Sequence, residues 1–384
     1  MDAVSLVNLS PVVRVMLMGA VIALGPLSWI WLRHRQASGA QRLRALTLLT
    51  LFLTFDLVLF GAFTRLTDSG LGCPDWPGCY GSASPLGAHA PITAAQQAMP
   101  TGPVTHSKAW IEMVHRYLAT AVGVLILVLA VASTVERRRL RVSPAWAWLT
   151  LLWVCLQGAF GALTVTMKLF PAIVTLHLLG GLVLLALLRA QVVAYDTRPE
   201  SVSEPLPLHP TTRSALLLVY GLLWMQIALG GWVSTNYAVL ACETFPTCQG
   251  GWWPTMNFSE GFTIWRALGM NAEGQPIDFS ALTAIHYVHR LFAYVVLLAL
   301  GWLSWRLWSA PATRHHARWL LALLWWQFAT GMSNVVLDWP LLSAVGHTGG
   351  AAGLVLVLTG VLLGSRTADD TVSASKFNVS RLTS

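Results

Sequence analysis

The chain has 384 residues, of which 55% are hydrophobic and only 10% are charged, and its mean hydropathy is +0.61. Since a soluble domain carries about 25% charged residues, this composition excludes an ordinary water-soluble protein and indicates a polytopic membrane protein. Basic residues outnumber acidic ones, 24 to 16, for a net charge of +8. The position of these charges decides whether they indicate nucleic-acid binding.

Nine segments are apolar over the length of about 20 residues that a membrane helix needs. In chain order they are 12–32, 45–64, 110–134, 144–166, 170–195, 214–235, 280–305, 316–336 and 339–364. The first is too long for the apolar region of a signal peptide and lacks a small-residue cleavage site, so we expect a retained anchor helix. The loops 65–109 and 236–279 are rich in Gly, Pro and Trp and show no strong helical period.

The basic residues are distributed by topology. Seventeen Lys and Arg residues lie in alternate connections between the nine segments or in the tail from Arg366. The positive-inside rule makes these connections cytoplasmic, which predicts a periplasmic N-terminus and a cytoplasmic C-terminus in a bacterial inner membrane. Because topology explains the positive charge, nucleic-acid binding is not expected.

Comparison of the chain with itself at an offset near 170 residues reveals an internal repeat. The matching features are Gly61-Ala62 with Gly230-Gly231, Cys73/Cys79 with Cys242/Cys248, Val114-His115-Arg116 with Val288-His289-Arg290, Gln157 with Gln327, and His177 with His347. We therefore expect an all-α membrane protein with two tandem pseudo-symmetric four-helix bundles and one extra N-terminal transmembrane helix. The expected parts are an anchor helix with an Arg-rich loop at 1–44, bundles at 45–200 and 201–366, and a polar cytoplasmic tail at 367–384.

Four of the eleven histidines belong to the repeat, namely His115, His177, His289 and His347. Each lies about five to ten residues into a helix that runs inward, so all four are expected in the outer half of the membrane. A polar side chain in hydrocarbon is costly and functional by default. Four at matched depth favour metal or haem ligation over buried structural histidines, and two imidazoles on facing helices suit a haem iron.

Two further features accompany these histidines. Small residues follow each histidine by four positions, where a flat macrocycle could lie against the helix: Ala119, Gly181, Ala293 and Ala351. Arg116 and Arg290 directly follow a histidine, and haem propionates are plausible partners for them. Internal ion pairs or backbone carbonyl contacts are the alternative for both arginines.

Glu112 precedes His115 by one helical turn, whereas His286 occupies the matching position in the second repeat. A carboxylate beside only one histidine pair predicts that this site carries out chemistry while the other relays electrons. Burial favours a protonated acid, which makes Glu112 a candidate proton donor or acceptor. The alternative is that Glu112 is only the ion-pair partner of Arg116.

The four repeated cysteines lie in expected external loops, where disulfides persist. This favours two bonds within loops, Cys73–Cys79 and Cys242–Cys248, which act either as structural links or, for the first pair, in transfer of reducing equivalents or haem. Cys155 lies inside a span and is expected to be an inert apolar residue.

Several motifs together resemble the haem A synthase family over about residues 45–364. They are GAFTRLTDSG at 61–70, both cysteine pairs, WIEMVHR at 110–116, Leu240-Ala241-Cys242 with Pro246-x-Cys248, and His289-Arg290. The resemblance implies oxidation of a ring methyl of haem O to a formyl group, giving haem A for terminal oxidases. It also implies that His289 and His347 hold a resident haem b, that His115 and His177 hold the substrate haem, and that Glu112 is the essential acid. The extra N-terminal helix departs from the family's eight helices but lies outside these motifs.

The implied partners are haem O synthase, an electron donor of unknown identity and membrane lipid, and a homo-oligomer is also compatible with the sequence. Two rival functions remain. A dihaem cytochrome b subunit of a quinol or ferric reductase would bind two haems b permanently, and a haem or small-molecule transporter would move a ligand without oxidising it. Extraction and chromatography of the bound haems distinguishes all three.

Overall fold

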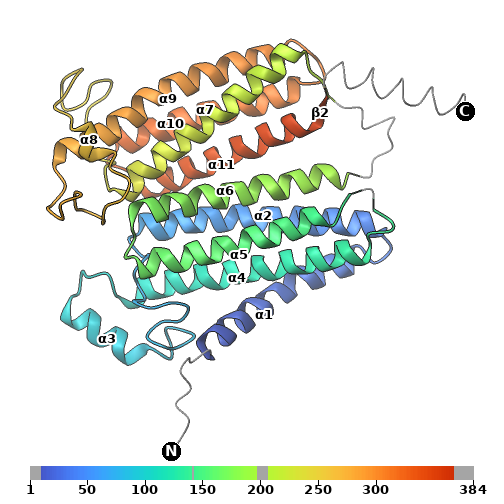
Figure 1. Cartoon of the computed structure of the whole chain (residues 1–384), viewed down its shortest axis with the longest axis horizontal. Coiled ribbons are helices and arrows are strands. Elements are labelled where there is room, and N and C mark those ends of the chain that lie inside the picture. The colour runs from blue at the N-terminus through green and yellow to red at the C-terminus, as the bar shows by residue number, and fades with distance from the viewer. Residues whose placement is uncertain (1–9, 141, 197–205, 367–384) are drawn as a thin grey trace, which may run out of the picture. The chain divides into compact units, whose positions relative to one another are not determined.

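The computed structural model describes residues 10–140, 142–196 and 206–366 (Figure 1). These residues are helical apart from loops and one pair of two-residue strands. The long helices are α1 (Ser10–Arg33), α2 (Gly39–Leu66), α4 (His106–Val135), α5 (Ala145–Thr166), α6 (Pro171–Ala194), α7 (Pro210–Thr235), α9 (Phe279–Trp308), α10 (Arg314–Val336) and α11 (Leu341–Gly364). The strands β1 (Leu206–Pro207) and β2 (Ser365–Arg366) pair in parallel. The expected tail at 367–384 lies outside the described residues.

Eight of the nine predicted spans are helices that are long and apolar enough to cross a membrane. The remaining predicted span, α10, is a helix of 23 residues but does not reach the apolarity of a membrane-spanning helix. It begins with Arg314, His315 and His316 and contains three tryptophans, which lower its mean hydropathy. The described residues thus define a multi-pass membrane protein with eight clear spans, and the count of nine stays a prediction.

The outward faces of these helices are apolar, as a lipid environment requires. Large hydrophobic side chains are widely exposed, including Val21, Leu152 and Leu298 at 63%, 68% and 76%. A soluble protein rarely exposes so much apolar surface. Since the helices satisfy their own backbone hydrogen bonds, such surfaces are stable against lipid.

Contacts divide the chain into two compact units, each described here by itself. The first contains Met1–Gln191 and Phe262–Asp278, and the second contains Val192–Gly261 and Phe279–Ser384. In the first unit α4 packs against α1, α2, α5 and the short helix α3 (His89–Ala98). The indole Nε1 of Trp153 in α5 donates to the carbonyl of Gly180 in α6 at 2.8 Å, which joins these two helices.

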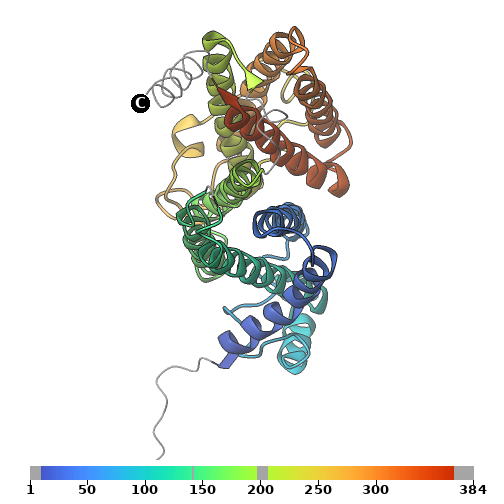
Figure 2. The ribbon, with the colours of Figure 1, turned by 90° about the vertical axis from the view of Figure 1, so that its right-hand side faces the viewer.

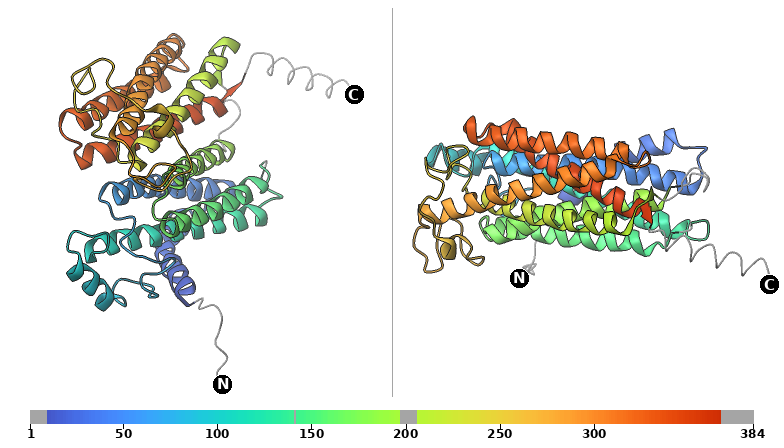
Figure 3. Two further views of the ribbon diagram at one scale, coloured as in Figure 1. Left: turned by 60° about the vertical axis from the view of Figure 1, so that its left-hand side comes forward. Right: turned by 90° about the horizontal axis from the view of Figure 1, so that it is seen from above.

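In the second unit α7 packs against α9, α9 against α10, α10 against α11, and α11 against α7, which closes a ring of four helices. The loop containing the short helix α8 (Phe258–Gly261) lies at the end of this unit where α9 and α11 begin (Figures 1 and 3). The local sequence favours the start of α7. Pro210 occupies the first turn of α7, where its missing N–H is not needed.

Helix α1 lies obliquely across α4 (Figures 1 and 2). The two backbones approach closely at Gly19, where an added methyl group would lie 2.6 Å from Cβ of Thr120. Val15 of α1 belongs to a buried cluster that includes Cys73, Cys79 and Met113. The extra helix lies outside the family motifs in the sequence, but in the structure it covers the first cysteine pair.

The loop between α2 and α4 contains more helix than its sequence indicated. Residues 65–109 include α3, which has ten residues. Ile92 is its only buried side chain. A helix that buries one residue produces no 3.6-residue apolar period, so the hydrophobic pattern could not reveal it.

Candidate functional site

The four repeated histidines lie six to ten residues after the first residue of α4, α6, α9 and α11. At 1.5 Å per residue this places them about 9–15 Å from the helix starts. His115 and His177 both lie in the first unit, and His289 and His347 both lie in the second. The structure therefore brings together the two pairs that the repeat predicts.

Each of these histidines faces a glycine on a neighbouring helix. Measured from a methyl group built on the glycine to the nearest ring atom, the separations are 3.1 Å for Gly61 and His115, 3.5 Å for Gly161 and His177, 2.9 Å for Gly230 and His289, and 3.3 Å for Gly331 and His347. Most larger side chains at these positions would displace the imidazole. Glycine thus lets a helix backbone pass directly beside each ring.

These residues fit a haem iron bound by two imidazoles. A bis-histidine haem needs two imidazoles from different helices, and each unit contains two such histidines. In the first unit the Nδ1 atom of His177 is buried and has no hydrogen-bond partner in the described chain. Among the described residues, no group of three or more His, Cys, Asp or Glu side chains is arranged to hold a metal ion.

Glu112 and Arg116 form a buried clamp on the loop that follows α2. The Oε2 atom of Glu112 accepts a hydrogen bond from the backbone N–H of Cys73 at 2.8 Å, and its Oε1 atom is paired with Arg116. The other end of the Arg116 guanidinium donates to the carbonyls of Asp75, Pro77 and Gly78. Both side chains are at least nine-tenths buried.

The second unit contains the equivalent clamp without the carboxylate. The Nδ1 atom of His286 accepts from the backbone N–H of Cys242 at 3.2 Å. Arg290 donates to loop carbonyls, including that of Thr244 at 3.0 Å and that of Thr247 at 3.3 Å. His286 lies at the position that matches Glu112. It therefore accepts from the loop backbone in the second unit as Glu112 does in the first.

Arg116 and Arg290 both donate to loop carbonyls, and Arg116 is also paired with Glu112. Adjacent residues on a helix do not face the same direction, so an arginine directly after an inward-facing histidine points elsewhere. The structure thus shows the alternative considered for these arginines, with carbonyl contacts at both and an internal ion pair at Arg116. Propionate binding by these two residues stays a prediction that no contact here supports.

Both cysteine pairs form disulfide bonds, Cys73–Cys79 and Cys242–Cys248, as predicted. All four cysteines are almost fully buried. The two loops share a cis peptide bond before proline, at Trp76–Pro77 and Phe245–Pro246, and a left-handed residue after the second cysteine, Tyr80 or Gln249. The fifth cysteine, Cys155, is a free thiol on an exposed face of α5.

The sequence comparison missed Gly161, Gly331, Thr330 and Gln226. The two glycines were detectable because both follow the matched glutamines, Gln157 and Gln327, by four residues. Thr330 and Gln226 contact the Nδ1 atoms of His347 and His289, at 2.9 Å and 3.1 Å. They had no repeat signal because the first unit has Phe160 and Leu57 in their places.

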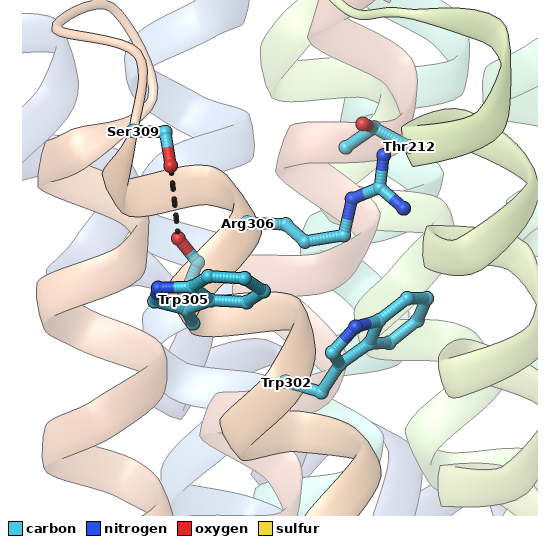
Figure 4. Close-up of a pocket in the computed structure, with 5 residues that line it drawn as sticks. All are labelled: Thr212, Trp302, Trp305, Arg306 and Ser309. Carbon is cyan, nitrogen blue, oxygen red and sulfur yellow. Dashed lines mark hydrogen bonds between the residues drawn. The ribbon is translucent and has the colours of Figure 1, made fainter.

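A separate pocket lies at the opposite end of the second unit from its histidines. It is lined by Thr212, Trp302, Trp305, Arg306 and Ser309 (Figure 4). Arg306 follows His289 by 17 residues in the same helix, a rise of about 25 Å. This pocket therefore takes no part in the histidine sites.

Within the described part of the chain, eight apolar helices long enough to cross a membrane, with two loops closed by disulfides, define a polytopic membrane protein. A family model described as "Cytochrome oxidase assembly protein" (COX15-CtaA) matches residues 44–359. The chain belongs to this family.

Curated relatives are named "Heme A synthase". The protein from Shewanella oneidensis is 38% identical over 81% of this chain and 92% of its own length. Those from Sinorhizobium medicae and Alkalihalophilus pseudofirmus are 30% and 25% identical, over 83% and 72% of this chain and 88% and 79% of their own lengths.

Proposed function

We propose that this protein is a haem A synthase that oxidises a ring methyl group of haem O to a formyl group. The reaction consists of two successive hydroxylations of the methyl carbon, each of which needs an activated oxygen species as oxidant together with electrons and protons, and the resulting geminal diol then loses water. The family match and the relatives of the same name support this function. The observation that carries it is the presence of two histidine pairs, of which only one has a buried carboxylate close by.

The two pairs have different roles in this proposal. His115 and His177 bind the substrate haem in the first unit, and His289 and His347 bind a resident haem b in the second. Haem b, when bound, supplies one-electron transfer. The unequal surroundings of the pairs support this division, because Glu112 lies near the first pair and side chains contact both rings of the second.

Glu112 can hold and move a proton at its carboxylate oxygens. Its two oxygens are each engaged, Oε1 with Arg116 and Oε2 with the N–H of Cys73. Protonation removes the charge and weakens both contacts. Proton uptake at Glu112 would therefore loosen the loop at Cys73, whereas the equivalent His286 contact carries no such charge in its neutral form.

The proposal also includes orientation and partners. The alternate distribution of Lys and Arg supports a periplasmic N-terminus and a cytoplasmic C-terminus in the inner membrane. Haem O synthase would supply the substrate and a membrane electron donor would supply electrons. The two extramembrane loops would then both face the periplasm, where their disulfides persist.

Chromatography of extracted haems tests the function. The protein is purified from cells that also express a haem O synthase, and its haems are extracted. Haem O, a hydroxylated haem or haem A beside haem b is the expected result. Haem b alone, at two per chain, would instead identify a dihaem electron-transfer protein.

A Glu112 series tests its role as an acid or base. Glu112→Ala should retain haem b but form no haem A, and Glu112→Gln should do the same although its amide oxygen can still accept from the N–H of Cys73. His286→Ala is the matched control, because it removes the equivalent loop contact from the second unit. Normal haem A formation in Glu112→Gln would show that Glu112 only anchors the loop.

A further inference from the structure

Thr330 determines which nitrogen of His347 carries a proton. The Oγ1 atom of Thr330 donates to the carbonyl of Trp326 at 2.7 Å, one turn earlier in α10. The same oxygen lies 2.9 Å from the Nδ1 atom of His347. Because a hydroxyl group has one hydrogen to donate, it can only accept from Nδ1 while that hydrogen is donated to Trp326. Nδ1 therefore carries the proton, and Nε2 keeps a free lone pair.

This tautomer is the one that binds a metal through Nε2. Histidine ligands usually donate their other N–H to an oxygen acceptor, which fixes the ring orientation and raises the basicity of the ligand. The backbone of His347 is held as well, because Gln327 donates to its carbonyl at 2.8 Å. Ser343 donates to the carbonyl of Thr330 at 3.1 Å, which connects the start of α11 to α10 at this position.

The equivalent histidine of the first unit has no such acceptor. The segment QGAFG at 157–161 corresponds to QFATG at 327–331, so Phe160 stands where the second unit has Thr330. The Nδ1 atom of His177 is buried without a hydrogen-bond partner in the described chain. Its ring therefore has neither a fixed tautomer nor a hydrogen bond that resists rotation.

We propose that Thr330 is a positioning residue that makes His347 a permanent axial ligand, and that Phe160 at the equivalent position makes His177 the exchangeable ligand of the substrate haem. The inference rests on the proposed division between a resident and a substrate haem. It explains how two similar histidine pairs serve different purposes. A resident haem must stay bound, whereas a substrate haem must enter, react and leave as product.

Variants of Thr330 test the first half of the proposal. Thr330→Val keeps the shape of the side chain but removes the acceptor, and Thr330→Ser keeps the hydroxyl group. In the purified holoprotein, Thr330→Val should raise the midpoint potential of haem b, because a less basic imidazole stabilises ferric iron less well. Thr330→Val should also weaken haem b binding about 10–100-fold. Thr330→Ser should keep the midpoint potential and the haem b affinity of the wild type. A Thr330→Val protein with the potential and haem content of the wild type would overturn the proposal.

Variants of Phe160 test the second half in the other unit. Phe160→Thr introduces the missing hydroxyl group beside His177. Phe160→Val is the matched control, because valine is similar in size to threonine but has no hydroxyl group. The Thr variant should retain more haem O or hydroxylated haem after purification than the Val variant, with the haem b potential unchanged in both. Equal retention in the two variants would refute the role of this position.

His347→Met separates this inference from the proposed function. This variant should shift or abolish the haem b spectrum. An unchanged spectrum would show that His347 is not a ligand, and the proposed site would fail. A changed spectrum in His347→Met together with a wild-type potential in Thr330→Val would leave the site standing and remove only the role of Thr330.

Discussion

Arg116→Met should open the loop between α2 and α4 that contains Cys73 and Cys79. The substitution keeps much of the apolar side chain but removes three hydrogen bonds to loop carbonyls and the ion pair with Glu112. Breaking a buried ion pair by removing one partner costs about 3–5 kcal/mol, because the remaining charge is left without compensation. Since about 1.4 kcal/mol corresponds to a factor of ten, opening of the loop should become at least about 100-fold more frequent.

The reduction rate of the Cys73–Cys79 disulfide measures this opening. Both cysteines are fully buried, so a small thiol reductant reaches them only when the loop opens. After timed exposure to the reductant, the new thiols are labelled and quantified by mass spectrometry of the loop peptides. The Cys242–Cys248 disulfide in the same molecules is an internal control and should react at its wild-type rate.

Two further variants identify the physical cause. Arg290→Met removes carbonyl contacts from the second loop but leaves no buried carboxylate unpaired, so its effect on Cys242–Cys248 should be smaller. Glu112→Gln combined with Arg116→Met removes the uncompensated charge and should slow reduction relative to Arg116→Met alone. Wild-type reduction of Cys73–Cys79 in Arg116→Met would refute the clamp.

The close approaches of glycine predict two more outcomes. Gly230→Leu should displace His289 and abolish the haem b spectrum, because even a methyl group at this position lies 2.9 Å from the ring; an intact spectrum would contradict the packing. Gly19→Leu should separate α1 from α4 at Thr120 and accelerate reduction of Cys73–Cys79, with haem b unchanged. If that disulfide stays as resistant as in the wild type, α1 does not protect it.

The structure favours a structural role for the resting Cys73–Cys79 bond. The bond is buried in a cluster that includes Val15 of α1 and Met113 of α4, and the backbone N–H of Cys73 donates to Glu112. A redox partner could not reach the sulfur atoms without movement of these elements. If Glu112 takes up a proton during turnover, the weakened contact with Cys73 is the step at which such movement would begin.

Much of this protein follows from its sequence because the deciding signals are local or repeated. Eight spans were predictable from runs of apolar residues, since a membrane helix satisfies its own hydrogen bonds and needs only an apolar surface. The short spacing within each cysteine pair indicated disulfides inside each loop. The repeat of about 170 residues identified the four histidines before their surroundings were known.

Tertiary structure decided what each polar side chain contacts. The carbonyl partners of Arg116 lie 38 to 41 residues earlier in the chain. At this distance in sequence, no local pattern indicates that these carbonyls accept hydrogen bonds from the guanidinium. The Nδ1 atom of His347 contacts a hydroxyl group of another helix, and that hydroxyl group also donates to the carbonyl of Trp326. Such choices arise only when packing brings distant donors and acceptors within hydrogen-bond distance in a place where water cannot substitute for either.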